Sequence, residues 1–364
     1  MTTHRIERLR AALARAGLDA LALVPGANLW YLLGLTIHPS ERLAIAFIPA
    51  AGPIRVVLPA LEQPRAAAEA RVPVRWYPWR DDTGYEAVLR ACAGDLQLGG
   101  RLGVEYTAMR LLELRAIEAV ARVETIDATG LLAELRMVKD TDELAAMRAA
   151  VRAVEAGLAA AIAAIRPGVT EREIAAAWEQ AMRAAGSAEP AFTTIVASGP
   201  NSANPHHTTG ERQIQTGDLV ILDGGARVGG YVSDITRTVA VGEIDAELRR
   251  VYEIVREANA AGVAAARPSV SGAQIDAAAR SVIEQAGYGA YFIHRTGHGL
   301  GLETHEPPYL HAANRAPLPS GATFTVEPGI YLPGRGGVRI EDDVVLTDHG
   351  AERLTTFPRE LIVC

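Results

Sequence analysis

The sequence predicts an α/β region up to about residue 125 and an α+β region from about residue 130 to the C-terminus. In the first region, short apolar runs alternate with helical patterns, and this alternation is typical of α/β domains. In the second region, long helical segments are followed by groups of strand-like segments. A chain of 364 residues, 49% of them hydrophobic, is long enough for two domains with large cores.

Hydrophobic periodicity predicts the elements of the first region. Residues 5–16 repeat apolar positions at helical spacing and predict the first helix. Apolar runs separated by proline and glycine predict strands at 19–24, 42–48 and 53–58. Further helical patterns cover 62–70, 85–92 and 108–120.

Capping signals divide the second region into helices. A long helical pattern breaks near Lys139 and Asp140, resumes with a capping pair of Asp140 and Glu143, and stops at Pro167-Gly168. Thr170 with Glu173, and Ser271 with Gln274, open two more helices. Strands are predicted at 192–198, 218–225, 230–241, 322–332 and 336–347. The order of helices and then strands occurs twice, at 141–241 and 245–346, as an internal duplication would produce.

Charge and composition exclude several classes of protein. The net charge of −7 and the pI near 5.8 argue against nucleic-acid and anionic-membrane partners. Two cysteines, Cys92 and Cys364, form neither a disulfide framework nor a CxxC metal site. The N-terminus lacks the apolar segment of a secretory signal, and no apolar run reaches the roughly 18 residues of a membrane span. We therefore expect a cytoplasmic protein.

Two aspartates on neighbouring strand-like segments indicate a cation site. Asp223 ends the run DLVILD, and Asp234 lies eleven residues later, beyond a glycine-rich middle. A hairpin turn centred between Val228 and Gly229 places the two side chains directly opposite each other, about 4.5–5.5 Å apart at Cβ. Two carboxylates at that distance repel each other in an apolar setting, and a bound cation removes the repulsion. The alternative is that one aspartate caps the turn and the other faces solvent.

Three further residues extend the candidate ligand set. His298 lies between glycines in RTGHGLG, Glu327 lies within the strand-like run FTVEPGIY, and Glu341 lies in GVRIEDD. Four carboxylates and one imidazole suit two divalent ions about 3.5–4 Å apart, with shared carboxylates as bridges. Oxygen-rich ligands with one nitrogen suit Mn²⁺, Co²⁺ or Fe²⁺, with Zn²⁺ as a further alternative, and we take Mn²⁺ as the first choice.

A known family carries its ligands in the same order. The contexts LDGGARVGGYVSDITRT, TGHGLGLETHE, TVEPGIYLPG and GGVRIED resemble the "pita-bread" metallopeptidases of family M24, which include methionine aminopeptidases, aminopeptidase P and prolidase. The stretch GLDALALVPGANLWYLLGL is similar to the creatinase-like domain of Xaa-Pro peptidases. The resemblance implies a creatinase-like α/β domain at 1–128 and a pita-bread α+β catalytic domain at 129–364.

The resemblance also implies roles for the site residues. Glu327 moves a proton to the leaving nitrogen, and His206 and His305 bind the substrate and steady its scissile carbonyl. Tyr331 contributes to substrate binding. Arg339 contributes to catalysis, because its charge lowers the pKa of Glu341 and fixes its rotamer. The implied metal ligands are Asp223, Asp234, His298, Glu327 and Glu341. His207, next to His206, is expected to be a surface residue of the loop.

The activity that the resemblance implies is hydrolysis of the Xaa-Pro bond at the N-terminus of peptides or dipeptides, by a hydroxide that bridges the two ions. The alternatives on the same fold are a metal-free creatinase-like amidinohydrolase, an activity like that of methionine aminopeptidases, and a binding protein that has lost catalysis. The complete ligand set, with His206 and His305 intact, argues against the metal-free enzyme and the binding protein.

The sequence indicates the length of the substrate peptide and the oligomeric state less clearly. Some prolidases carry an arginine four residues after the histidine that matches His305, where it can hold the carboxylate of a dipeptide. Here Tyr309 takes that place, with Arg315 further on, which weakens a strict dipeptidase assignment and leaves aminopeptidase P activity, or both. The family also implies a homodimer, with Trp30 and Tyr31 near a subunit boundary or the rim of the active site.

Overall fold

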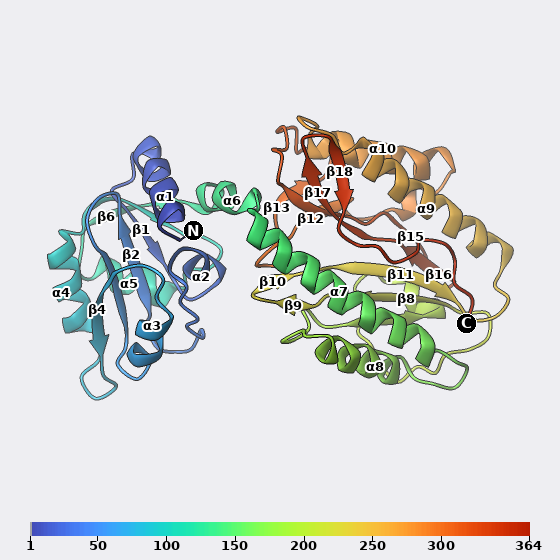
Figure 1. The fold of residues 1–364 in the computed structure, drawn as a ribbon, viewed down its shortest axis with the longest axis horizontal. Coiled ribbons are helices and arrows are strands. Elements are labelled where there is room, and N and C mark those ends of the chain that lie inside the picture. The colour runs from blue at the N-terminus through green and yellow to red at the C-terminus, as the bar shows by residue number, and fades with distance from the viewer. Residues whose placement is uncertain (1) are drawn as a thin grey trace. The chain divides into compact units, whose positions relative to one another are not determined.

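The structure is a computed structural model that describes residues 2–364, and the chain separates into two compact units (Figure 1). The first unit ends at Arg136, and the second covers Met137–Cys364. This division lies at the C-terminal end of helix α6 (Thr129–Met137). The domain boundary predicted from the sequence, between residues 128 and 129, lies at the other end of the same helix.

The first unit is a six-stranded mixed sheet with helices around it. The strand order is β4-β3-β2-β1-β5-β6, in which β2 pairs antiparallel with β1 and β3 and the other pairs are parallel. The strands are β1 (Ala20–Leu23), β2 (Ile45–Pro49), β3 (Ile54–Pro59), β4 (Val74–Trp79), β5 (Gly100–Val104) and β6 (Val123–Asp127). The helices are α1 (Thr2–Ala16), α2 (Ala27–Leu33), α3 (Gln63–Glu69), α4 (Glu86–Leu96) and α5 (Leu111–Glu118). The strands and helices predicted for this region are confirmed, but α2 and β4 to β6 were not predicted.

The second unit begins its helices where the capping signals predicted. The Asp140 side chain accepts hydrogen bonds from the backbone N–H groups of Asp142 and Glu143. The Glu143 side chain in turn accepts a hydrogen bond from the backbone N–H of Asp140. Thr170 and Ser271 cap their helices in the same reciprocal way. The helices are α7 (Thr141–Ala164), α8 (Glu171–Ala184), α9 (Ala246–Ala265) and α10 (Gly272–Gln285), with 3₁₀ turns at Gly199–Ala203 and Gly289–Tyr291. Within residues 2–364, no helix has both the length and the apolarity needed to cross a membrane.

The strands of the second unit are all antiparallel. One sheet has the order β11-β8-β7, another has the order β13-β12-β14-β17-β18, and two hairpins stand apart. The sheet strands are β7 (Ile195–Ser198), β8 (Leu219–Gly224), β11 (Ile235–Ala240), β12 (Gly297–Gly299), β13 (Glu306–Leu310), β14 (Thr323–Val326), β17 (Asp342–Thr347) and β18 (Gly350–Arg353). The hairpins pair β9 (Arg227–Val228) with β10 (Tyr231–Val232), and β15 (Gly329–Leu332) with β16 (Gly336–Arg339).

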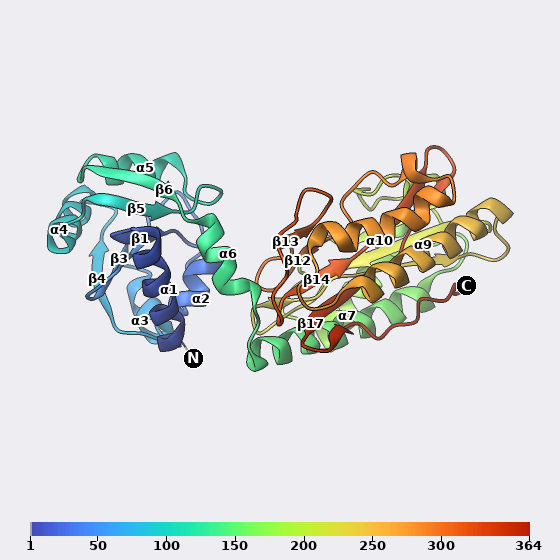
Figure 2. The same ribbon diagram turned by 90° about the horizontal axis from the view of Figure 1, so that it is seen from above.

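Helix pairs cover the strands of the second unit from different sides (Figures 1 and 2). Trp178 of α8 is fully buried in one core with Val220 and Leu222 of β8. On α9, Tyr252 belongs to a second core, which includes Ile340. The strand residues between these cores are therefore held rigidly, and they carry the candidate site.

The pairing of β8 with β11 corrects one expectation. Asp223 pairs with Thr236 and not with Asp234. The turn of the β9–β10 hairpin is centred between Gly229 and Gly230, whose φ angles of 58° and 87° suit a two-residue type I′ turn. Moving the turn by one residue shifts the pairing by two residues. Both aspartates therefore stay on one face of the sheet, because side chains alternate with a period of two.

Candidate active site

The second unit contains a cavity of about 460 Å³ that brings most of the predicted site residues together. All five predicted metal ligands line it, and so do His206, His305 and Arg339. Tyr331 does not belong to the lining. A volume of this size lies in the lower half of the range of about 300–1,000 Å³ that is usual for small-ligand sites.

Backbone hydrogen bonds between segments far apart in the sequence position two of the carboxylates. Glu327 follows β14 directly, rather than lying within a strand, and its N–H donates to the carbonyl of Thr296 at 2.8 Å. Glu341 lies between β16 and β17, and its N–H donates to the carbonyl of Thr236 at 3.1 Å. The backbone at both residues is therefore fixed by segments next to other site residues, His298 and Asp234.

Three of the predicted ligands form a tight buried cluster. Asp234, His298 and Glu341 each place one potential ligand atom within 4.8 Å of the others. The Nε2 atom of His298 also lies 3.3 Å from Oε1 of Glu327 and 3.8 Å from Oδ2 of Asp234. Asp223 lies in the same cavity but outside this cluster.

The electrostatics of the cluster fit a bound cation. Burial, followed by the charges of Glu341 and Asp223, raises the pKa of Asp234 well above its ordinary value. Burial likewise raises the pKa of Glu327 to about 7. Among the described residues, no group donates a hydrogen bond to the buried Oδ1 atoms of Asp223 and Asp234. Unpaired buried carboxylate oxygens are costly, so the donor set matches divalent cations.

His298 is prepared to act as a neutral ligand. Burial lowers its pKa to about 3, so its imidazole carries no charge near neutral pH. Its Nδ1 lies 3.1 Å from the carbonyl oxygen of Gly299. Because a carbonyl only accepts hydrogen bonds, Nδ1 carries the proton, and Nε2 presents its lone pair toward Asp234 and Glu327.

Arg339 contacts Asp223 directly and reaches Glu341 through the hydroxyl of Thr236. Its Nη2 donates to Oδ2 of Asp223 at 2.6 Å, and its Nε donates to Oγ1 of Thr236 at 3.1 Å. The hydroxyl of Thr236 in turn donates to Oε2 of Glu341 at 2.6 Å. Burial raises the pKa of Glu341 well above its ordinary value. The charge of Arg339 lowers the pKa of Glu341, as expected, but burial and the charges of Glu327 and Asp223 outweigh this effect.

Tyr331 lies behind the cavity wall. Its hydroxyl accepts a hydrogen bond from Nη1 of Arg339 at 2.9 Å and lies 2.8 Å from Nε2 of His294. The Nδ1 of His294 faces the carbonyl of Arg295 at 2.7 Å, so Nδ1 donates and Nε2 accepts from the Tyr331 hydroxyl. Tyr331 therefore acts on the cavity through His294 and Arg339, which both line it.

The two predicted substrate histidines reach the cavity from loops. The imidazole of His305 lies edge-on to that of His298, with 4.2 Å between the ring centroids. Partial burial, followed by the charge of Arg295, lowers the pKa of His305. His206 is exposed, and its backbone N–H donates to Oδ1 of Asn204 at 3.1 Å.

The residue after His206 anchors the loop. Nε2 of His207 lies 2.8 Å from Oε2 of the fully buried Glu171, so the expectation of a surface histidine is wrong. Glu171 also accepts hydrogen bonds from Ser198 and Asn201. Burial by itself would raise the pKa of Glu171, but the hydrogen bonds from Asn201, Ser198 and His207 outweigh it and lower the pKa. The loop is thus tied to a charged carboxylate at the start of α8.

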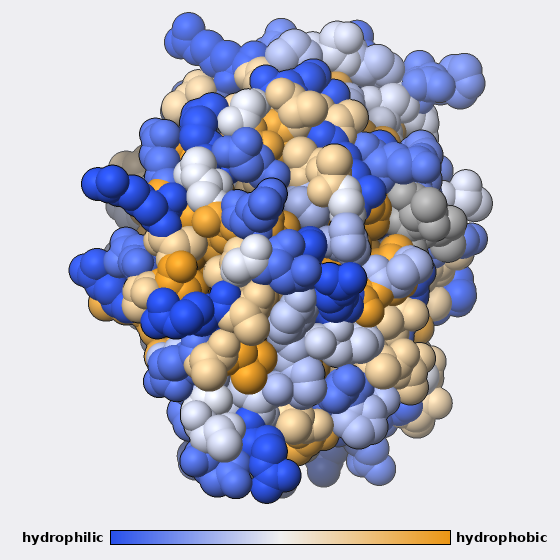
Figure 3. Space-filling model, turned by 90° about the vertical axis from the view of Figure 1, so that its left-hand side faces the viewer, coloured by the Kyte–Doolittle hydropathy of each residue, from blue (hydrophilic) through white to orange (hydrophobic). Residues whose placement is uncertain are grey.

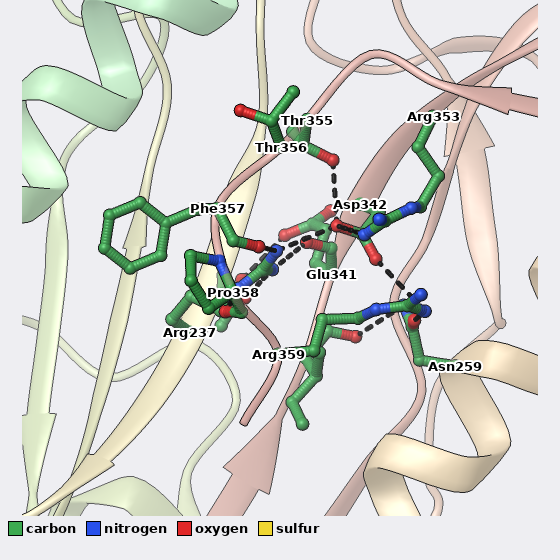
Figure 4. A network of polar contacts seen from close by, with 12 residues as sticks. Arg237, Asn259, Glu341, Asp342, Arg353, Thr355, Thr356, Phe357, Pro358 and Arg359 are labelled. Atoms are coloured by element: carbon green, nitrogen blue, oxygen red, sulfur yellow. Dashed lines mark hydrogen bonds and ion pairs between the residues drawn. The ribbon is translucent and has the colours of Figure 1, made fainter. Parts of the chain in front are cut away.

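A buried ionic network holds the strand segments that carry Thr236 and Glu341 (Figure 4). Nη2 of Arg237 lies 2.9 Å from Oδ1 of Asp342, and both side chains are almost fully buried. Arg237 also donates to the carbonyl oxygens of Glu341, Phe357 and Pro358. The network therefore ties the C-terminal segment to the strands behind the cavity.

Comparison with protein-family models shows to which family the chain belongs. The model of "Metallopeptidase family M24" matches residues 145–348, which is more than half of the chain. The chain belongs to metallopeptidase family M24. A second family model, "Creatinase/Prolidase N-terminal domain", matches residues 5–138. The pita-bread fold and the creatinase-like N-terminal domain expected from the sequence are confirmed.

Similar M24 proteins cover almost the whole chain. The probable dipeptidase PepE of Mycobacterium tuberculosis is 41% identical over 363 residues, which are 99% of this chain and 96% of that protein. The Xaa-Pro dipeptidase of Pyrococcus furiosus is 37% identical over 362 residues, which are 99% of each chain. A solved dipeptidase from Pyrococcus horikoshii OT3 is 42% identical, with a TM-score of 0.94 over 99% of this chain and 100% of that chain. These relatives confirm that the protein is a peptidase of this family.

The M24 cavity also has lining residues that the sequence argument missed, namely Phe192, Ile195, Pro205, His294, Arg295 and Thr304. Phe192 and Ile195 lie in a segment recognised only as a strand, and an apolar residue in a strand carries no signal of function. His294 and Arg295 directly precede Thr296 and the His298 motif. Their proximity in sequence to a metal ligand was the one available signal.

Proposed function

We propose that this M24 protein hydrolyses the Xaa-Pro bond at the N-terminus of peptides or dipeptides in a metal-dependent reaction. One observation carries the proposal: the cluster of Asp234, His298 and Glu341 lies in a cavity that His206 and His305 also line. The relatives named Xaa-Pro dipeptidase support the preference for proline.

Two divalent ions, with Mn²⁺ as the first choice, would occupy the site. Asp223 and Asp234 would hold one ion, and His298 and Glu327 would hold the other, with Asp234 and Glu341 shared. The unpaired Oδ1 atoms of Asp223 and Asp234 and the lone pair on Nε2 of His298 support this assignment. When bound, such ions polarise the scissile carbonyl and acidify a water molecule.

The side chains of the site would carry the remaining parts of the reaction. His206 and His305 would donate hydrogen bonds to the oxygen of the scissile carbonyl, where negative charge develops. Water adds its oxygen to the carbonyl carbon, and the C–N bond to proline breaks. Glu327 would take the proton from that water and give it to the proline nitrogen, which leaves as a secondary amine.

Proline suits a site of this kind. An Xaa-Pro bond is a tertiary amide without an N–H, and the ring fixes φ of the proline. A site that holds its substrate through that N–H would therefore bind Xaa-Pro poorly. The named groups of this cavity address the carbonyl and the leaving nitrogen, and they do not require an N–H on the scissile bond.

Metal reconstitution with matched peptides tests the proposal. Protein stripped with a chelator and then loaded with Mn²⁺ should hydrolyse Ala-Pro and Ala-Pro-Ala, and much less Ala-Ala. The stripped protein should be inactive on all three peptides. Turnover of Ala-Ala equal to that of the proline substrates, or full turnover without metal, would contradict it. Cleavage of Met-Ala-Ser in preference to Ala-Pro-Ala would point instead to a methionine aminopeptidase activity.

We also propose that the protein forms a homodimer and works in the cytoplasm, as expected from the sequence. Large apolar side chains of the first unit support an association surface: Leu61, Tyr106 and Leu111 are 62%, 58% and 72% exposed. On the face shown in Figure 3, apolar residues are interspersed with polar ones. Tyr31 is only 2% exposed, so it offers no surface to a partner subunit.

A further inference from the structure

Arg295 supplies an uncommitted positive charge to the cavity. It lines the cavity, and among the described residues no carboxylate forms an ion pair with its guanidinium and no acceptor takes a hydrogen bond from it. The other arginine of the lining, Arg339, is occupied by Asp223, Tyr331 and Thr236. Arg295 is therefore the lining arginine whose donors are free for a ligand.

An aromatic ring holds this guanidinium in place. The Cζ atom of Arg295 lies 4.4 Å from the centre of the Tyr309 ring. Tyr309 belongs to β13 and pairs with His298 of β12, so the supporting ring is fixed to the same ladder as a predicted metal ligand. A contact over the ring uses the face of the guanidinium and leaves the N–H groups in its plane free. Such a planar pair of donors matches a carboxylate.

The chemistry of a dipeptide places a carboxylate close to the scissile bond, in the cavity that Arg295 lines. In an Xaa-Pro dipeptide the carboxylate is bonded to the proline Cα, which is itself bonded to the scissile nitrogen. A substrate with its scissile bond at the acidic cluster therefore brings a negative charge into a cavity already lined by four carboxylates. The two divalent ions proposed above would balance those four carboxylates, so the substrate carboxylate adds one further negative charge, for which Arg295 offers free donors.

We propose that Arg295 binds the C-terminal carboxylate of the substrate and makes dipeptides the preferred substrate class. The inference rests on the proposed Xaa-Pro activity and narrows it. A longer peptide has a neutral amide at the same position, and the charge-assisted pair with Arg295 is lost. Tyr309 serves as the support of this arginine, so its presence in place of an arginine is compatible with a dipeptidase.

Three substrates that differ only beyond proline test the inference: Ala-Pro, its amide Ala-Pro-NH₂, and Ala-Pro-Ala. Metal-loaded wild-type protein should show the highest kcat/KM for Ala-Pro. Arg295→Gln should lower kcat/KM for Ala-Pro by about ten- to a hundredfold, the range for one charge-assisted hydrogen-bonded contact, mainly through KM. Its kcat/KM for the amide and the tripeptide should change less than about threefold. Arg295→Lys, which keeps the charge and loses the planar fork, should show a smaller loss that is again confined to Ala-Pro.

Arg315→Gln is the matched control, because it removes the same charge from an exposed arginine outside the cavity lining. It should leave all three substrates unchanged. Equal losses on all three substrates in both Arg295 variants, or no loss on Ala-Pro, would overturn the role of Arg295 while the Xaa-Pro activity stands. If the wild-type protein cleaves none of the three substrates, the proposed function itself fails, and the inference fails with it. Melting temperatures of the variants identify any loss of folding. If Arg295→Gln does not fold, the comparison of the three substrates is made with Arg295→Lys.

Discussion

At the scale of single residues, the site contains more buried carboxylate oxygens than the chain has donors to satisfy. Asp223 receives Arg339, and Glu341 receives the hydroxyl of Thr236. The Oδ1 atom of Asp234 receives no donor from the described residues, although its carboxylate lies within the cluster. We infer that Asp234 gains most from a bound cation and that its loss would affect metal content most.

His305 should separate catalysis from metal binding. We expect His305→Ala to lower kcat by about 10²–10³, as for the loss of one donor to a developing oxyanion. Metal content should stay at the wild-type level, and KM should change less than kcat, because the contact matters mainly in the transition state. The measurements are bound metal per chain, melting temperature and steady-state kinetics on Ala-Pro.

His349→Ala is a suitable control for this variant, since His349 is an exposed residue outside the cavity lining. Metal loss in step with activity in His305→Ala would make His305 a ligand. A near-normal kcat would make it part of the loop scaffold around Pro307 and Pro308.

Candidate ligands could be predicted from the sequence because each lies in a distinctive local context. Their partners could not, because a side chain's direction depends on strands that come from elsewhere in the chain. Arg339 was expected to act on Glu341, two residues away, and its charge does so, but its direct hydrogen bond to Asp223 on β8 was not predicted. Arg295 was not considered at all, since only the packing of β12 on β13 brings Tyr309 beneath its guanidinium.

At the scale of elements, helix starts were predictable and strand register was not. Capping at Asp140, Thr170 and Ser271 depends on residues within one turn, so sequence alone indicates it. The register of β8 with β11 depends on which two glycines form the turn, and the sequence around Gly229 and Gly230 permits more than one choice. A shift of two residues keeps the two aspartates on one face, so the expectation that they face the same side does not depend on this register.

The Arg237–Asp342 pair should stabilise the strands behind the cavity. We expect Arg237→Met to lower the free energy of unfolding by about 3 kcal/mol or more, because it leaves the buried carboxylate of Asp342 without its closest cation. Arg353→Gln is the control. Arg353 is partly exposed and 3.7 Å from the same carboxylate, so its loss should cost less than about 1 kcal/mol. Urea unfolding of the metal-loaded proteins measures the free energy of unfolding of both variants. Equal losses in the two variants would refute the role of Arg237.

At the scale of the whole molecule, we propose that two chains associate. We expect sedimentation velocity at micromolar concentration to give the mass of a dimer, twice the 38.6 kDa of the chain. The exposed Leu61, Tyr106 and Leu111 motivate this expectation, because a partner subunit could cover such apolar surface. A single species with the mass of one chain at micromolar concentration would refute the expected dimer.

The central claim is that the acidic cluster holds two metal ions on which peptide hydrolysis depends. The most direct measurement is metal content by elemental analysis, combined with Ala-Pro turnover, as chelated protein is titrated with Mn²⁺. Wild-type protein should reach full turnover near two equivalents per chain. Asp234→Ala should keep its fold but lose most metal and nearly all turnover, whereas a variant of the exposed Asp348, Asp348→Ala, should behave as wild type. Full turnover by Asp234→Ala in the absence of bound metal would contradict the claim.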